Sequence, residues 1–171
     1  DLVVMGTKGS SGWNEYLIGS NTEKVVRWAK VPVFAIHTAT DLTAIRKIVF
    51  PTTLTQDHAD LIAKVKALQA FFGASLEILW INTPMNFKTD AESKPLMEEF
   101  ARKNNLENYH LHVRNDTVAE DAIAHFVKEI GGDMIAMATH GRKGLAHALI
   151  GSVTESVVNH IRCPIWSYTL H

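Results

Sequence analysis

The chain has 171 residues, of which 46% are hydrophobic and 20% charged, and this composition is typical of a globular protein rather than a disordered one. Its 17 basic and 18 acidic side chains form no long run of either sign, so we expect no nucleic-acid interface and no membrane-binding patch. The single cysteine, Cys163, excludes an intramolecular disulfide and favours a reducing compartment. We therefore expect a cytoplasmic protein.

Strands and helices are predicted to alternate along the chain, which opens inside an apolar segment, residues 1–5, expected to be a strand. Five later apolar runs are also predicted to be strands: residues 47–50, 76–81, 109–113, 134–138 and 165–168. Four segments between them repeat apolar residues at helical spacing: residues 56–72, 96–101, 117–130 and 153–161. Asp116 or Thr117 is expected to cap the third helix. This order predicts a parallel sheet with helices on both faces.

An internal repeat divides the chain into two units. Residues 1–36 align without a gap on residues 133–168, and fourteen of the 36 pairs are identical. The identical pairs include three glycines, a serine and a proline: Gly9/Gly141, Gly12/Gly144, Gly19/Gly151, Ser20/Ser152 and Pro32/Pro164. Chance similarity between amphipathic helices would not keep these residues in register, so the two segments are expected to be copies of one structural element.

The repeat sets the expected domain boundaries. Residues 44–171 are predicted to form one complete α/β domain, a doubly wound five-stranded parallel sheet. Residues 1–40 supply only strand, helix and strand, the C-terminal remnant of a preceding copy. Because the chain starts within a strand and without an initiator methionine, we expect it to be a fragment whose upstream part has been removed.

The loop after the fourth strand of each copy is the candidate phosphate site. Its spacing is G-x2-G-x9-G-S in the first copy, from Gly6 to Ser20, and A-x2-G-x9-G-S in the second, from Ala138 to Ser152. Glycine lets backbone amides approach an anion, and a Gly-Ser pair before a helix adds unpaired amides and a hydroxyl. The alternative is that the glycines only shape the loop and the serines only cap helices.

A loop of this spacing after the fourth strand of a small parallel α/β domain, followed by a helix, a proline and a short apolar strand, resembles the universal stress protein family. The resemblance covers essentially the whole chain. It implies an adenine nucleotide alpha hydrolase-like fold with strand order 3-2-1-4-5 that pairs through its last strand. It also implies that loop glycines and the Gly-Ser pair hold ribose and phosphates. In the ATP-binding branch, a residue after the first strand, commonly Asp, and backbone at the end of the second strand hold adenine.

Carried onto this chain, the resemblance implies ATP or another adenine nucleotide as ligand, with or without Mg²⁺. The implied nucleotide-binding residues of the complete domain are Thr52, Thr53, Ile81, Ala138, Thr139, His140, Gly141, Arg142, Gly144, Gly151, Ser152, Val153 and Thr154. Those of the truncated copy are Gly6, Gly9, Gly19, Ser20 and Asn21. Two positions depart from the family pattern, because Thr53 stands where Asp is common and Ala138 replaces the first motif glycine. The Cβ of Ala138 would crowd a ribose or phosphate.

No catalytic residue and no metal site is predicted, because no Ser-His-Asp, Cys-His or paired-carboxylate arrangement stands out. His110 and His112 share one face of the third strand, an edge in the implied order, and are expected to be exposed polar side chains. We expect a stress-response module that acts by binding and dimerisation. A slow ATPase or nucleotide hydrolase, and a domain that has lost its nucleotide and serves only in pairing, are the alternatives.

The family's mode of pairing implies contact between the two last strands, within one chain or between two. These segments run from Val33 to Ile36 and from Ile165 to Tyr168. They are expected to lie antiparallel, related by a pseudo-two-fold axis.

Overall fold

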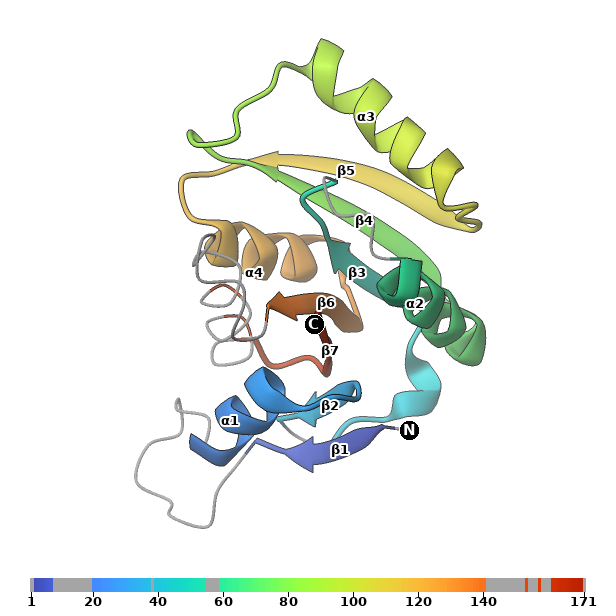
Figure 1. Ribbon diagram of the computed structural model, residues 1–171, viewed down its shortest axis with the longest axis vertical. Coiled ribbons are helices and arrows are strands. Elements are labelled where there is room, and N and C mark those ends of the chain that lie inside the picture. The colour runs from blue at the N-terminus through green and yellow to red at the C-terminus, as the bar shows by residue number, and fades with distance from the viewer. Residues whose placement is uncertain are drawn as a thin grey trace.

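Figure 1 shows the computed structural model, which describes residues 2–7, 20–37, 39–54, 59–140, 153, 157 and 161–170. The described strands form one sheet in the order β1-β2-β7-β6-β3-β4-β5. Their bounds are β1 Val3–Gly6, β2 Val33–Ile36, β3 Lys47–Pro51, β4 Ser75–Asn82, β5 Tyr109–Asn115, β6 Met134–His140 and β7 Ile165–Leu170. Neighbouring strands are parallel throughout, except that β2 and β7 are antiparallel.

Helices cover both faces of this sheet (Figure 1). Their bounds are α1 Ser20–Trp28, α2 Ala59–Phe72, α3 Asp90–Lys103 and α4 Ala119–Ile130, with a short 3-10 helix at Leu42–Ala44. Buried residues of α2 and α3 pack with Ile48, Phe50 and Trp166 in one core. Those of α4 pack with Val49 and Ile165 in a second core on the opposite face. Alternate residues of the inner strands β3, β4 and β6 therefore enter different cores, as expected for strands buried on both sides.

Strands β3 to β7 have the predicted order. Numbered within the second unit, β5-β4-β3-β6-β7 is 3-2-1-4-5, so the doubly wound fold is confirmed. The first strand of this unit, β3, is central, and its residues Ile48, Val49 and Phe50 are at most 2% exposed. Of the predicted fourth helix, the structure describes Val153 and Val157, both helical, and Ile161, which lies just outside the helix and donates its amide to the carbonyl of Val157 at 3.0 Å.

Glycines fix the end of α4 against the sheet. Gly131 has φ 61°, ψ 50° and donates its backbone N–H to the carbonyl of Val127, which is a left-handed helix termination. A Cβ on the next residue, Gly132, would lie 2.8 Å from Cγ2 of Val49, so glycine allows the chain to pass close to β3.

The start of α4 differs from expectation. Its N-cap is Val118, because the Asp116 carboxylate instead accepts from the amides of Thr117 and Val118.

The β2–β7 seam has internal symmetry. Its register pairs Val33 with Ser167, Phe34 with Trp166 and Ala35 with Ile165. In the sequence repeat, residues 33, 34 and 35 correspond to residues 165, 166 and 167, so exchanging the two units maps this pairing onto itself. Phe34 and Trp166 lie in the same core. The pseudo-two-fold axis therefore passes between these two residues, perpendicular to the sheet.

Among the described residues, no helix is long and apolar enough to cross a membrane.

Candidate functional site

The candidate site lies at the carboxyl ends of β3, β4 and β6, where open α/β sheets bind ligands. These ends share one edge of the sheet. Because β2 runs antiparallel to β7, the carboxyl ends of β1 and β2 lie at the opposite edge. Gly6 at the end of β1 is therefore well separated from the predicted nucleotide-binding residues at the ends of β3, β4 and β6.

Strands β3 and β6 diverge toward these carboxyl ends. Their pairing covers only Ile48 with Met134 and Val49 with Ile135. By contrast, β3 stays paired with β4 through Pro51, and β6 stays paired with β7 through His140. The sheet therefore opens between β3 and β6, at the point where strand order reverses.

This opening brings together several predicted residues from distant parts of the chain. Thr52 and Thr53 follow β3, and extending the β3–β4 register sets Thr53 level with Ile81. Extending the β3–β6 register sets Thr52 level with Ala138. Both threonines and Ala138 are partly exposed, whereas Ile81 is 8% exposed. The predicted adenine-binding residues and the first motif position thus lie on either side of the opening between β3 and β6.

The chain turns sharply on leaving this opening. The hydroxyl of Thr52 accepts from the amide of Leu54 at 3.2 Å, and the amide of Thr52 donates to the carbonyl of Leu79 at 3.0 Å. Leu54 has φ 60°, a left-handed conformation that is costly for a leucine. Local backbone strain of this kind is often found beside binding sites. The two hydrogen bonds of Thr52 fix the chain at the rim of the opening between β3 and β6.

The predicted residue Thr139 has a structural role instead. It is 4% exposed, and its hydroxyl donates to Oγ1 of Thr169 at 2.9 Å. The equivalent residues of the first copy, Thr7 and His37, are joined in the same way at 2.8 Å. In both copies this bond links the last two strands near their carboxyl ends. The Thr139 side chain is therefore not directed at the opening.

At the end of β4, asparagines that the sequence analysis did not single out organise the rim. The side chain of Asn82, which is 5% exposed, donates from Nδ2 to the Lys88 carbonyl and to Oδ1 of Asn115. Nδ2 of the Asn86 side chain donates to the carbonyl of Ile81 at 3.2 Å. The Ile81 carbonyl thus already has a partner. Asparagine after a strand is so common in turns that the sequence alone gave no signal for this network.

One buried polar group near this rim has no hydrogen-bond partner in the described part of the chain. Trp80 is 2% exposed, lies two residues before the end of β4, and its Nε1 has no acceptor. An unsatisfied buried N–H costs stability, so a water or ligand acceptor at this position would be favourable.

The Cβ of the first motif position distinguishes the two copies. At Gly6, no heavy atom of the described residues lies within 4 Å of the position that a Cβ would occupy. Packing against the described part of the chain therefore does not require glycine there. In the second copy this position is Ala138, whose methyl group occupies the corresponding space.

Most of the glycine-rich loop falls outside the described residues. This is so for the predicted residues Gly9, Gly19, Gly141, Arg142, Gly144, Gly151, Ser152 and Thr154. For Ser20, Asn21 and His140 only the backbone is described, the first two at the start of α1 and the last at the end of β6.

A buried carboxylate with two histidines was missed by the sequence analysis. Glu77 of β4 is 4% exposed and accepts from Oγ of Ser75 at 2.7 Å. Nδ1 of His110 and Nε2 of His112, both on β5, lie 3.1 and 2.7 Å from its two oxygens. His112 also packs on the ring of Phe126, with centroids 4.8 Å apart. The expectation that both histidines are merely exposed edge residues was wrong for His112, which is part-buried.

These hydrogen bonds determine the charge of the cluster. Burial raises the pKa of Glu77, but hydrogen bonds from Ser75, His112 and His110 together outweigh it, so the pKa lies below its ordinary value. Glu77 is therefore ionised at neutral pH. In the part of the chain that the structure describes, no group of three or more His, Cys, Asp or Glu residues could hold a metal ion. The cluster is thus a network of hydrogen bonds between β4 and β5.

The strand order of the parallel sheet reverses between β3 and β6, and helices cover both faces of the sheet. These features define a doubly wound α/β protein of the adenine nucleotide alpha hydrolase-like fold. The chain belongs to the universal stress protein family, whose model matches residues 1–37 and 44–168.

Two curated relatives carry the family name. The universal stress protein E homolog of Haemophilus influenzae is 33% identical over 67 residues, which are 39% of this chain and 21% of that protein. Universal stress protein Slr1230 of Synechocystis is 22% identical over 176 residues, covering 98% of this chain and 58% of that protein. The chain therefore spans at most about three fifths of the length of these relatives.

Solved structures share the fold. A universal stress protein from Archaeoglobus fulgidus has a TM-score of 0.71 at 22% identity, covering 98% of this chain and 60% of that one. A universal stress protein in complex with cAMP has a TM-score of 0.56 at 18% identity, covering 75% and 98%. A second Archaeoglobus fulgidus protein, in complex with dAMP, has a TM-score of 0.53 at 16% identity, covering 74% and 98%.

Proposed function

We propose that this chain is a stress-response module that binds an adenine nucleotide in the crevice between β3 and β6. The divergence of these two strands after Val49 and Ile135 carries the proposal, because it opens the sheet at the topological switch point. The cAMP and dAMP complexes of proteins with this fold are consistent with such a ligand.

In this proposal different residues around the crevice bind different parts of the nucleotide. Thr52 and Thr53 after β3, with backbone near Ile81 of β4, hold the adenine. The loop that follows Ala138, from Gly141 to Ser152, holds ribose and phosphates through backbone amides and the serine hydroxyl. Mg²⁺ would then bind through the phosphates. The rim side chains Thr52, Thr53 and Ile81 offer no general base, so we propose binding rather than turnover.

We further propose a tandem organisation. Two matches to one family model, and relatives longer than this chain, support the reading of residues 1–40 as the C-terminal part of one unit and 44–171 as a whole second unit. Pairing of the units is then part of the function. The β2–β7 seam supports this, because Phe34 and Trp166 on it are only 4% and 3% exposed.

Titration calorimetry with ATP, ADP, AMP and cAMP, each with and without Mg²⁺, tests nucleotide binding. Ala138→Gly should tighten binding by removing the methyl group, and Thr53→Asp should tighten it by restoring the family's usual residue. Thr117→Asp, which adds the same charge to an exposed residue after β5, should leave the affinity unchanged. Failure of the parent and of Ala138→Gly to bind any of these nucleotides would contradict the proposal.

A further inference from the structure

The outer edge of the sheet is formed by β5, which among the described strands pairs with β4 alone. The amide of Leu76 donates to the Asn108 carbonyl, and the amide of Asp116 donates to the Asn82 carbonyl. In a parallel ladder alternate residues bond to the same neighbour. The backbone groups of His110 and His112 therefore face β4, and those of Leu111 and Val113 face outward.

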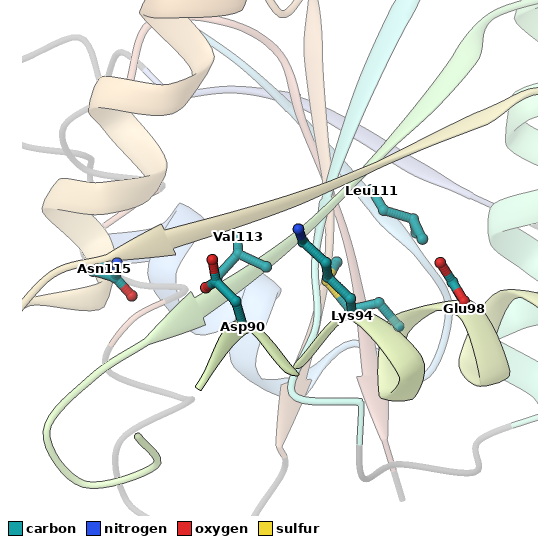
Figure 2. Close-up of a pocket in the computed structure, with 7 residues that line it drawn as sticks. Asp90, Lys94, Glu98, Leu111, Val113 and Asn115 are labelled. Atoms are coloured by element: carbon teal, nitrogen blue, oxygen red, sulfur yellow. The ribbon is translucent and has the colours of Figure 1, made fainter. Parts of the chain in front are cut away.

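A groove of about 490 Å³ runs beside this edge. One wall is α3, with Asp90, Lys94, Met97 and Glu98, and the other is β5, with Leu111 and Val113. Figure 2 shows Asp90, Lys94 and Glu98 following one another along α3 beside the strand. Met97 is 1% exposed, whereas Leu111 and Val113 are partly exposed. The groove thus combines an apolar floor, a row of charges and outward-facing backbone groups.

The three charges are regularly spaced and available. Asp90, Lys94 and Glu98 are exposed, and none of them forms a salt bridge to another residue that the structure describes. Four residues of α-helix advance about 6 Å. Two residues of an extended strand advance about 6.4–6.8 Å. The negative, positive, negative order along α3 is therefore in step with alternate side chains of a strand lying in the groove.

We propose that this groove binds an extended segment of a partner protein, which adds a strand to the free edge of β5 and presents basic, acidic and basic side chains at alternate positions. The peptide backbone pairs with the outward amide and carbonyl of Leu111 and with the outward amide of Val113. The carbonyl of Val113 already accepts a hydrogen bond from Nη1 of Arg114 at 3.1 Å. The charged ends of its side chains meet Asp90, Lys94 and Glu98, while the aliphatic stems of the same side chains cover the partly exposed Leu111 and Val113. This inference is independent of nucleotide binding, since the groove lies on the far side of β4 from β3.

Two synthetic nine-residue peptides test the proposal, one with a central Lys-Val-Glu-Val-Lys and one with the charge-reversed Glu-Val-Lys-Val-Glu. Binding is followed by backbone NMR of the labelled chain. The first peptide should bind about tenfold more tightly than the second. A difference of this size is expected because the first peptide forms a few exposed ion pairs with α3, whereas the second places like charges beside each other. Amide exchange of Leu111 and Val113 should slow, while that of His110 and His112, already bonded to β4, should change little.

Variants of α3 separate this interaction from nonspecific attraction. The triple change Asp90→Lys, Lys94→Glu and Glu98→Lys should invert the preference between the peptides. Glu99→Lys, at an exposed position of the same helix outside the groove, should leave it unchanged. Equal binding of both peptides, binding without protection of Leu111 and Val113, or no binding of either would overturn the proposal. So would concentration-dependent protection of these amides without peptide, because a second copy would then be the occupant.

Discussion

Phe34 and Trp166 face each other across the antiparallel β2–β7 seam at equivalent positions of the sequence repeat. Both rings are nearly buried, and Trp166 also stacks on Tyr168 with centroids 6.2 Å apart. Packing at this point joins residues 1–40 to the second unit. Without it, the short β1-α1-β2 segment would bury too little surface to stay folded.

Trp166→Ala should therefore lower the free energy of unfolding by about 3–5 kcal/mol, as for other large-to-small aromatic changes in a core. Urea denaturation followed by circular dichroism measures this. Met85→Ala, at a side chain 83% exposed, is the control and should change it by no more than about 0.5 kcal/mol. In a Phe34→Ala/Trp166→Ala double variant the losses should not add, because the two residues share one contact region. Additive losses would show that the seam is not a coupled unit.

Glu77 should make stability depend on pH in the acid range. Its pKa in the folded protein is below the ordinary value of 4.5, so the unfolded chain binds its proton more readily. The stabilisation is complete above pH 4.5 and is lost as the pH falls through the lower, folded-state pKa. Glu77→Gln should be less stable than the parent by about 1–3 kcal/mol at pH 7, the cost of disturbing a buried charged hydrogen-bond network.

This difference between the parent and Glu77→Gln should shrink below pH 4.5 in urea titrations from pH 7 to pH 3. Glu99→Gln, at an exposed carboxylate, provides the matched control. A difference in unfolding free energy between the parent and Glu77→Gln that stays constant across this pH range would mean that the ionised form of Glu77 does not stabilise the fold.

Cys163 should be unreactive in the folded protein. Burial raises the pKa of its thiol to about 12, so very little thiolate exists at neutral pH. We expect its reaction with a disulfide reagent at pH 7.5 to be at least about a hundredfold slower in the native state than in urea. Equal rates in the two states would contradict the burial of the thiol.

Two glycine substitutions should differ in their effect on stability, because packing requires glycine at one position and not at the other. Gly132→Ala places a methyl group 2.8 Å from the Val49 side chain and should cost about 1–3 kcal/mol of unfolding free energy. Gly6→Ala meets no atom of the described residues within 4 Å and should be close to neutral. Thermal unfolding of both variants checks this. A large loss at Gly6 would show that glycine is needed there for the fold itself.

Turnover, if there is any, should be slow. The described rim residues Thr52, Thr53 and Ile81 cannot act as a general base, and typical enzymes turn over at roughly 1–10³ s⁻¹. A steady-state ATPase assay with Mg²⁺ should give a rate well below that range. A rate within that range, abolished by substitutions at the β3–β6 rim, would show that the chain is an enzyme rather than a binding module.

The sequence was sufficient to predict the strands of the second unit and its first three helices, and the resemblance to the universal stress protein family implied the order of the strands in the sheet. Apolar runs at β3 to β7 and helical spacing in between are local signals, and crossover handedness leaves few topologies for them. Local signals did not predict the Glu77 cluster. Its members are 33 and 35 residues apart, and a histidine on an edge strand has the same pattern whether it contacts solvent or a carboxylate on the neighbouring strand.

By itself, the sequence determined the family, the repeat and the candidate residues around the crevice, because glycine spacing and hydrophobic periodicity record what each segment needs locally. Only the tertiary structure decided where β3 and β6 part, that the Thr139 hydroxyl is used by Thr169, and that Asp90, Lys94 and Glu98 line a groove beside a free strand edge. These relationships depend on register and packing between distant segments. Each is set by the burial of two cores at once, and no single stretch of sequence contains that information.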